Sequence, residues 1–138
     1  MSFLLDTNVI SELRKPDGRR NPGVTAWAES VCPTELFLSV ISISELATWV
    51  GLTQRRDAAA GEHLAQWFDR IRQTYAARTL DIDPPVAIIA GQLHVPDPRD
   101  YRDAFIAATA IEHQLTVATR NTADFIQTGV PTLNPFSA

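Results

Sequence analysis

Short apolar runs alternate with helical patterns along the whole chain, and this alternation limits the possible folds more than any other feature. Residues 3–5, 36–40 and 115–118 are compact apolar runs, and residues 79–82 alternate apolar and polar side chains, so each is expected to form a strand. A strand reached through a helical crossover runs parallel to its predecessor, and the crossover helices cover both faces of the sheet. We therefore expect an α/β fold, a three-layer α/β/α sandwich with a mostly parallel sheet of four or five strands.

Helix boundaries are indicated by capping residues and prolines. Ser42 and Glu45 have the spacing of a capping box, which predicts a helix that opens at Ser42. The longest helical pattern begins at residues 55–57, and Gly61 predicts a kink or a break within it. A proline places the last short strand, within residues 130–133, at an edge of the sheet. The remaining helices are expected at residues 9–14, 22–28, 84–93 and 100–111.

Composition and charge exclude several classes of protein. A chain of 138 residues that is 45% hydrophobic suffices for a single domain, residues 1–138, and is not disordered. A net charge of −4 means that any RNA contact must use local basic patches. Cys32 is the only cysteine, which excludes an intrachain disulfide and a cysteine zinc cluster, and the three histidines share no metal-ligand spacing. With neither a signal peptide nor a membrane-spanning apolar stretch, we expect a soluble, cytoplasmic protein with no membrane partner.

Four acidic residues stand where predicted strands meet predicted helices. Asp6, Glu45 and Asp124 follow strands closely, and Asp103 lies in the first turn of the predicted buried helix. Each acid alone is explained as a helix cap or as a charge favoured by the helix dipole. A parallel sheet, however, brings its strand-to-helix junctions to one edge, so the four carboxylates can share a pocket. Clustered carboxylates need a compensating cation, and oxygen ligands suit Mg²⁺ or Mn²⁺, which supports metal-assisted phosphodiester hydrolysis.

Four stretches, in a fixed order, carry a family resemblance. They are residues 5–8, 39–46, 103–110 and 119–125, and residues 128–136 add a similar ending. In these motifs the chain resembles PIN-domain ribonucleases, specifically the toxins of the VapC or FitB type from bacterial toxin–antitoxin pairs. The resemblance implies a compact α/β/α domain that cleaves RNA with a divalent metal, a cognate antitoxin and a homodimer.

The resemblance also implies roles for particular residues. Carried over by motif, Asp6 and Asp103 are the main metal ligands, and Glu45 and Asp124 complete the catalytic site directly or through water. Asp6→Asn is then expected to abolish cleavage while leaving the thermal midpoint equal or higher in metal-free buffer, since it relieves clustered repulsion. The polar supports of the acids are Asn8, Thr119 and Asn121.

Local basic tracts are the candidates for RNA contact. In an acidic protein they would bind phosphates, although a solvated surface is their commoner role. They are Arg14, Lys15, Arg19 and Arg20 around the first loop, and Arg55 and Arg56 further along. A structured tRNA is expected as the substrate from the resemblance alone.

An antitoxin has a physical route to the acidic pocket. One of its Arg or Lys side chains would compete with the metal there, while the rest of the segment needs an apolar groove. Trp49, Trp67 and Phe68 are candidates for that groove, and ordinary core packing explains each of them at least as well.

Other classes of protein remain as alternatives. One is a catalytically silent PIN-like fold or another protein-binding module with an acidic pocket, and the presence of all four acids argues against a silent PIN fold. A receiver domain also needs a late lysine, but the only lysine is Lys15, and a haloacid-type phosphatase needs a second Asp where Asn8 stands.

Overall fold

The computed structural model describes residues 1–137, and a five-stranded sheet lies at its centre. Every neighbouring pair of strands is parallel, in the order β3-β2-β1-β4-β5. In the middle of the sheet, Phe3 pairs with Leu36 on one side and with Thr116 on the other. The strands are β1 (Phe3–Leu5), β2 (Leu36–Ser39), β3 (Thr79–Leu80), β4 (Thr116–Ala118) and β5 (Thr132–Leu133). The expected parallel sheet is confirmed, with the last strand at one edge.

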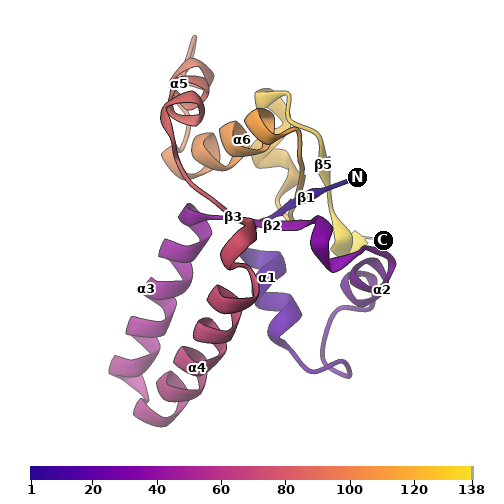
Figure 1. Ribbon diagram of the computed structural model, residues 1–138, viewed down its shortest axis with the longest axis vertical. Helices are drawn as coiled ribbons and strands as arrows, with labels where there is room; N and C mark the ends of the chain where they lie inside the picture. Colours follow the sequence, from indigo (N-terminus) through magenta and orange to yellow (C-terminus); the bar gives the residue numbers. More distant parts are fainter. Residues whose placement is uncertain (138) are drawn as a thin grey trace.

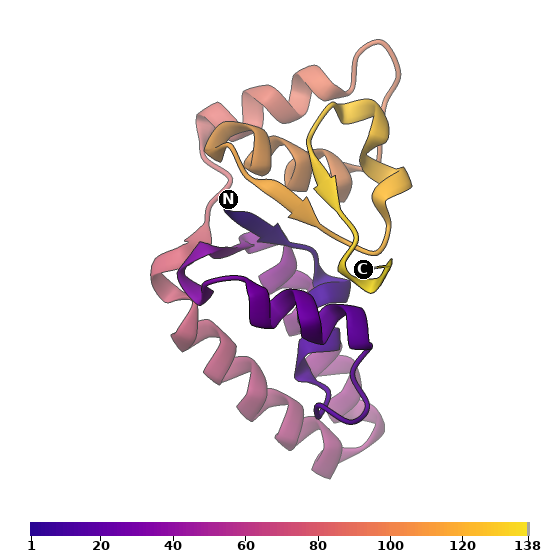
Figure 2. The same cartoon turned by 90° about the vertical axis from the view of Figure 1, so that its right-hand side faces the viewer.

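Helices cover both faces of this sheet, as Figures 1 and 2 show. Helices α1 to α4 lie against one face, and α5 and α6 lie against the other, which gives the three expected layers. The helices are α1 (Thr7–Arg14), α2 (Pro22–Ser30), α3 (Val40–Arg56), α4 (Ala58–Thr74), α5 (Pro84–Leu93) and α6 (Tyr101–His113). The described 3₁₀ segments are η1 (Pro33–Glu35), η2 (Ala76–Arg78), η3 (Thr122–Thr128) and η4 (Pro135–Ser137).

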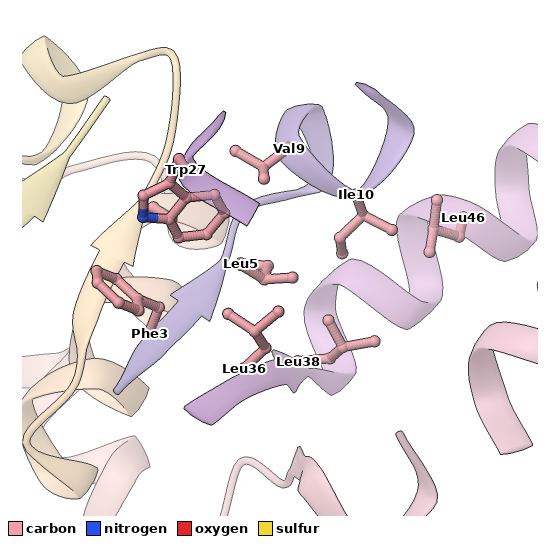
Figure 3. Close-up of a cluster of buried hydrophobic side chains, with 9 residues drawn as sticks. Phe3, Leu5, Val9, Ile10, Trp27, Leu36, Leu38 and Leu46 are labelled. Carbon is pink, nitrogen blue, oxygen red and sulfur yellow. The ribbon is translucent and has the colours of Figure 1, made fainter. Parts of the chain in front are cut away.

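The central strand divides the core between the two faces, because successive side chains of a strand point to opposite sides. Phe3 and Leu5 pack toward α1, α2 and α3, where the ring of Trp27 meets that of Phe3 edge-on at 5.2 Å between centroids (Figure 3). Leu4 points the other way and packs with Ile106 of α6. Each fully buried side chain of this size contributes about 1.5–3 kcal/mol, so β1 is held from both sides.

The start of α3 differs from the capping-box prediction. The helix begins at Val40, because Ser39 at the end of β2 is extended and its hydroxyl accepts a hydrogen bond from the Ile41 amide at 3.0 Å. Ser42 is therefore buried inside the helix rather than at its cap. The prediction that Ser42 and Glu45 form a capping box is wrong, and Glu45 is free for another partner.

Helices α3 and α4 form a hairpin that extends away from the sheet (Figure 1). Asp57 caps α4 by accepting hydrogen bonds from the Ala59 and Ala60 amides, both at 3.1 Å. The kink or break expected at Gly61 is absent from α4, which runs through that residue, and a Cβ there would meet the Cα of Gln54 at 2.5 Å. Gly61 thus permits the close approach of α3 and α4. Within residues 1–137, none of the helices is long and apolar enough to cross a membrane.

Candidate active site

Asp6 follows β1 directly and lies at the base of the site. It is only 1% exposed. One carboxylate oxygen, Oδ1, accepts the Thr7 amide at 2.8 Å, which caps α1, and also accepts a terminal nitrogen of Arg102. The other, Oδ2, accepts the Thr119 hydroxyl at 2.7 Å and the side-chain amide of Asn8 at 3.4 Å. Both explanations of Asp6, the structural cap and the site residue, therefore hold at once.

Glu45 comes to the same place from the second turn of α3. Its Oε1 accepts the Thr7 hydroxyl at 2.6 Å, and its Oε2 accepts the Nε of Arg102 at 2.8 Å. The Thr7 hydroxyl also lies 3.1 Å from that of Ser42. The Ser42 hydroxyl, expected to cap a helix, thus lies beside the residue that orients Glu45.

Arg102 connects three of the four acids, and the sequence prediction did not include it. Besides Asp6 and Glu45, its guanidinium reaches Asp103, with Nη1 3.0 Å from Oδ1. Burial alone would lower the pKa of Arg102, but the hydrogen bond to Glu45 and the nearby charge of Asp6 raise it above its ordinary value. The only sign of this role in the sequence was that a basic residue stands beside the predicted ligand Asp103. The sequence could not show in which direction the Arg102 side chain points.

Asp103 and Asp124 line the outer part of the site. Asp103 lies in the first turn of α6, where burial raises its pKa, Arg102 opposes the rise, and Asp100 and Asp124 add to it. Asp124 is exposed in η3, and its carboxylate makes no hydrogen bond or ion pair with residues 1–137. The two acids therefore stand in different environments.

Two of the three predicted supports, Asn8 and Thr119, contact Asp6, and the third, Asn121, contacts Thr119. Asn8 accepts the Arg120 amide at 3.0 Å, and its own side-chain amide lies 3.4 Å from the Thr119 hydroxyl. That hydroxyl accepts the Asn121 backbone amide at 3.0 Å, so the turn after β4 is fastened to Asp6 through Thr119. The supporting role of Asn121 thus comes from its backbone, while the residue also lines the cleft.

Glu45, Asp103 and Asp124 line a cleft of about 510 Å³ at the carboxyl edge of the sheet, and Asp6 lies buried beside it. Parallel α/β sheets place ligands at this edge. The cleft residues come from α1, α3, the start of α6 and the turn after β4: Thr7, Asn8, Ser11, Glu45, Asp100, Arg102, Asp103, Asn121 and Asp124. The sequence prediction named residues from each of these segments but omitted Thr7, Ser11, Asp100 and Arg102.

The donor set fits Mg²⁺ or Mn²⁺ in its chemistry. Three carboxylates converge on a single cationic group, and carboxylate oxygens are the ligands that these ions prefer. In the part of the chain that the structure describes, no three Asp, Glu, His or Cys side chains are placed to hold a metal as they stand. The guanidinium of Arg102 lies among the carboxylates instead.

The predicted RNA-binding residues lie outside this cleft. Arg14 lies over the rings of Trp49 and Trp67, at 5.9 and 5.7 Å from their centroids. Arg14 and Arg56 line a groove of about 400 Å³ between α1, α3 and α4.

The remaining predicted RNA-binding residues differ in whether other residues of the chain already bind their side chains. Lys15 pairs with Glu12 at 2.9 Å, and Arg20 donates to the carbonyls of Leu13 and Lys15 at 3.1 and 3.0 Å, so both hold the first loop together. Arg19 and Arg55 are exposed.

Comparison with known proteins defines the class. The PIN domain family model matches residues 3–130. Because the match covers most of the chain, the chain belongs to the PIN domain family.

Individual relatives show which members of the PIN domain family this chain is similar to. The chain is 38% identical to Toxin FitB of Neisseria gonorrhoeae, a match that covers 97% of this chain and 98% of that protein. It is 32% identical to VapC ribonuclease Y4jK of Sinorhizobium fredii over 97% of each chain. The crystal structure of FitAcB from Neisseria gonorrhoeae matches with a TM-score of 0.88 and 36% identity, covering 99% of both chains. The resemblance to VapC and FitB toxins is confirmed.

Proposed function

We propose that this chain is a divalent-metal-dependent endoribonuclease and the toxin of a bacterial toxin–antitoxin pair. The observation that carries the proposal is the convergence of Asp6, Glu45 and Asp103 on one cation position in an open cleft. The similarity to a VapC ribonuclease and to Toxin FitB supports RNA as the substrate and toxicity as the outcome.

The chain's own residues prepare the acids for this chemistry. The hydroxyl of Thr119 and the amide of Thr7 hold Asp6, and the hydroxyl of Thr7 holds Glu45, so both carboxylates have fixed directions. When bound, Mg²⁺ or Mn²⁺ would activate water and offset the charge that develops on the phosphate. Asp124 is exposed on the cleft, where its carboxylate can orient a water molecule or accept a proton.

Binding of RNA and of an antitoxin both require a surface beyond the acidic cleft. The groove lined by Arg14, Trp49 and Arg56 offers cations beside an aromatic ring, which suits phosphates and unstacked bases. The solved structure of the toxin–antitoxin complex from Klebsiella pneumoniae has the same fold, with a TM-score of 0.71, which supports a protein partner. We propose that an antitoxin covers this groove, Trp67 and the neighbouring Phe68, and that the active form is a cytoplasmic homodimer acting on RNA such as tRNA.

One observation favours a second candidate function. Arg102 already neutralises part of the acidic cluster, as expected of a catalytically silent protein-binding module. In that case purified protein would bind a partner without cleaving RNA.

Incubation of the purified chain with labelled single-stranded RNA and tRNA separates these functions. Cleavage should require Mg²⁺ or Mn²⁺, stop in EDTA and fall by at least roughly 100-fold in Asp103→Asn. Asp81→Asn, which changes an exposed acid beyond β3, is the matched control and should cleave normally. Cleavage in EDTA, or full activity of Asp103→Asn, would contradict the proposal, and no cleavage under any condition favours the silent module.

A further inference from the structure

The guanidinium of Arg102 occupies the position where the three inner carboxylates converge. Each of its nitrogens meets a different acid: Nε lies 2.8 Å from Glu45, Nη1 lies 3.0 Å from Asp103, and Nη2 contacts Asp6. The Arg102 side chain is 30% exposed, whereas that of Asp6 is 1% exposed. The cation thus reaches inward from the rim of the cleft to its buried base.

We propose that Arg102 is the internal counter-ion of the acidic cleft, which a divalent cation displaces, and that the displaced guanidinium then binds an RNA phosphate. This inference rests on the proposed function. It adds Arg102 to the four acids as a residue that takes part in metal binding and RNA binding.

The first half of the inference, that a divalent cation displaces Arg102, follows from competition between the two cations for the same carboxylate oxygens. Oδ2 of Asp6 accepts hydrogen bonds from Thr119 and Asn8, whereas Oδ1, which also accepts the Thr7 amide, is the oxygen that faces the cation of Arg102. Glu45 likewise turns one oxygen to Thr7 and the other to Arg102. A cation can use these oxygens only after the guanidinium leaves. Removing Arg102 should therefore strengthen metal binding, because the negative charges lose their only close compensation among the described residues.

The negative charge of the cleft supports the second half of the inference, which is that the displaced Arg102 binds a phosphate. Among the cleft residues within 1–137, Arg102 is the only one with a positive side chain, whereas Glu45, Asp100, Asp103 and Asp124 are acids. A phosphodiester that enters such a cleft is repelled unless a cation faces it. The guanidinium fork matches phosphate oxygens in a bidentate manner, and a partly exposed side chain at the first turn of α6 can turn toward the opening.

An ion pair that only holds the fold together predicts the opposite result. In that case loss of Arg102 disorders the carboxylates, so metal binding weakens. The direction of the change in metal affinity therefore distinguishes a displaceable counter-ion from a structural bridge.

Mn²⁺ binding to the purified chain tests the first half by electron paramagnetic resonance, which measures free Mn²⁺ without any turnover. Arg102→Gln should bind Mn²⁺ at least roughly tenfold more tightly than the natural chain, the change expected from losing a competing charged hydrogen bond. Arg102→Lys keeps the charge without the fork and should fall between the two. Arg120→Gln removes an exposed charge near the site that makes no ion pair with these acids, and should bind as the natural chain does.

RNA cleavage at saturating Mn²⁺ tests the second half. Arg102→Gln should raise KM by roughly tenfold, with a smaller effect on kcat, because one charged phosphate contact is lost. Circular dichroism of each variant confirms that the fold is intact, and Arg102→Lys serves if Arg102→Gln does not fold.

The outcomes separate this inference from the proposed function. Equal or weaker Mn²⁺ binding by Arg102→Gln overturns the counter-ion, and an unchanged KM overturns the phosphate contact, while cleavage by the natural chain leaves the nuclease assignment standing. Failure of the natural chain to bind Mn²⁺ and to cleave RNA overturns the proposed function and this inference with it.

Discussion

Asp6 is engaged at both carboxylate oxygens, by the Thr7 amide and Arg102 on one side and by Thr119 on the other. The sequence alone suggests that Asp6→Asn keeps or raises the thermal midpoint by relieving repulsion. In the structure this repulsion is already offset, because the guanidinium of Arg102 compensates the negative charge of Asp6. Asp6→Asn should instead lower the stability by about 1–3 kcal/mol, the usual effect of losing hydrogen bonds to a buried charge, while cleavage is lost.

Thermal unfolding in metal-free buffer measures this effect. Asp124→Asn is the matched control, because Asp124 is exposed and its carboxylate contacts no other described side chain by a hydrogen bond or ion pair. It should lose activity at unchanged stability. A midpoint of Asp6→Asn above that of the natural chain would show that repulsion dominates after all.

At the scale of the element, the α3–α4 hairpin depends on one glycine. A Cβ at Gly61 would lie 2.5 Å from the backbone of Gln54, so Gly61→Ala should destabilise the protein by about 1–3 kcal/mol. A Cβ at Gly51 would meet nothing within 4 Å, so Gly51→Ala should stabilise α3 by up to about 1 kcal/mol. Urea unfolding of both variants measures the difference, and equal effects would contradict the close packing of the two helices.

Glu12 ties α1 to the basic loop that follows it. It accepts the Asn21 amide at 2.8 Å and the Lys15 ammonium at 2.9 Å, and these two bonds lower its pKa below the ordinary 4.5. A lowered folded-state pKa means that the stabilisation is present at neutral pH and disappears as the pH falls through 4.5 and then through the folded-state value.

Glu12→Gln should therefore lower the thermal midpoint at pH 7 by roughly 4 °C, and the difference from the natural chain should shrink at about pH 3. Glu112→Gln, at an exposed position on α6, is the control and should show no such pH dependence. A difference that stays constant with pH would mean that the charge of Glu12 is not what holds the loop.

Sequence reasoning identified most elements because strand and helix periodicities are local. It also predicted that the four acids lie together, because parallel topology follows from the order of those elements. It placed the start of α3 three residues late, since Ser39 and Ser42 are both competent caps and only the end of β2 decides between them. Arg102 was missed because the direction of a long side chain depends on the pocket that receives it.

The whole molecule carries a net charge of −4, so RNA binding depends on where its cations are exposed. Arg20 binds two carbonyl oxygens, so reversing it would also disturb the loop. Arg19 and Arg55 are exposed, and Arg19→Glu with Arg55→Glu should weaken RNA binding and reduce the salt slope by about one for each lost phosphate contact. Fluorescence anisotropy at several salt concentrations measures the slope, and an unchanged slope would mean that both are only solvated surface.

The central claim is that the acidic cleft holds the divalent cation on which RNA cleavage depends. Anomalous scattering from crystals of the purified chain soaked with Mn²⁺ tests it most directly. We expect an anomalous peak bounded by the carboxylates of Asp6, Glu45 and Asp103, with the guanidinium of Arg102 moved away from Asp6. A peak elsewhere, or none at Mn²⁺ concentrations that support cleavage, would contradict the account.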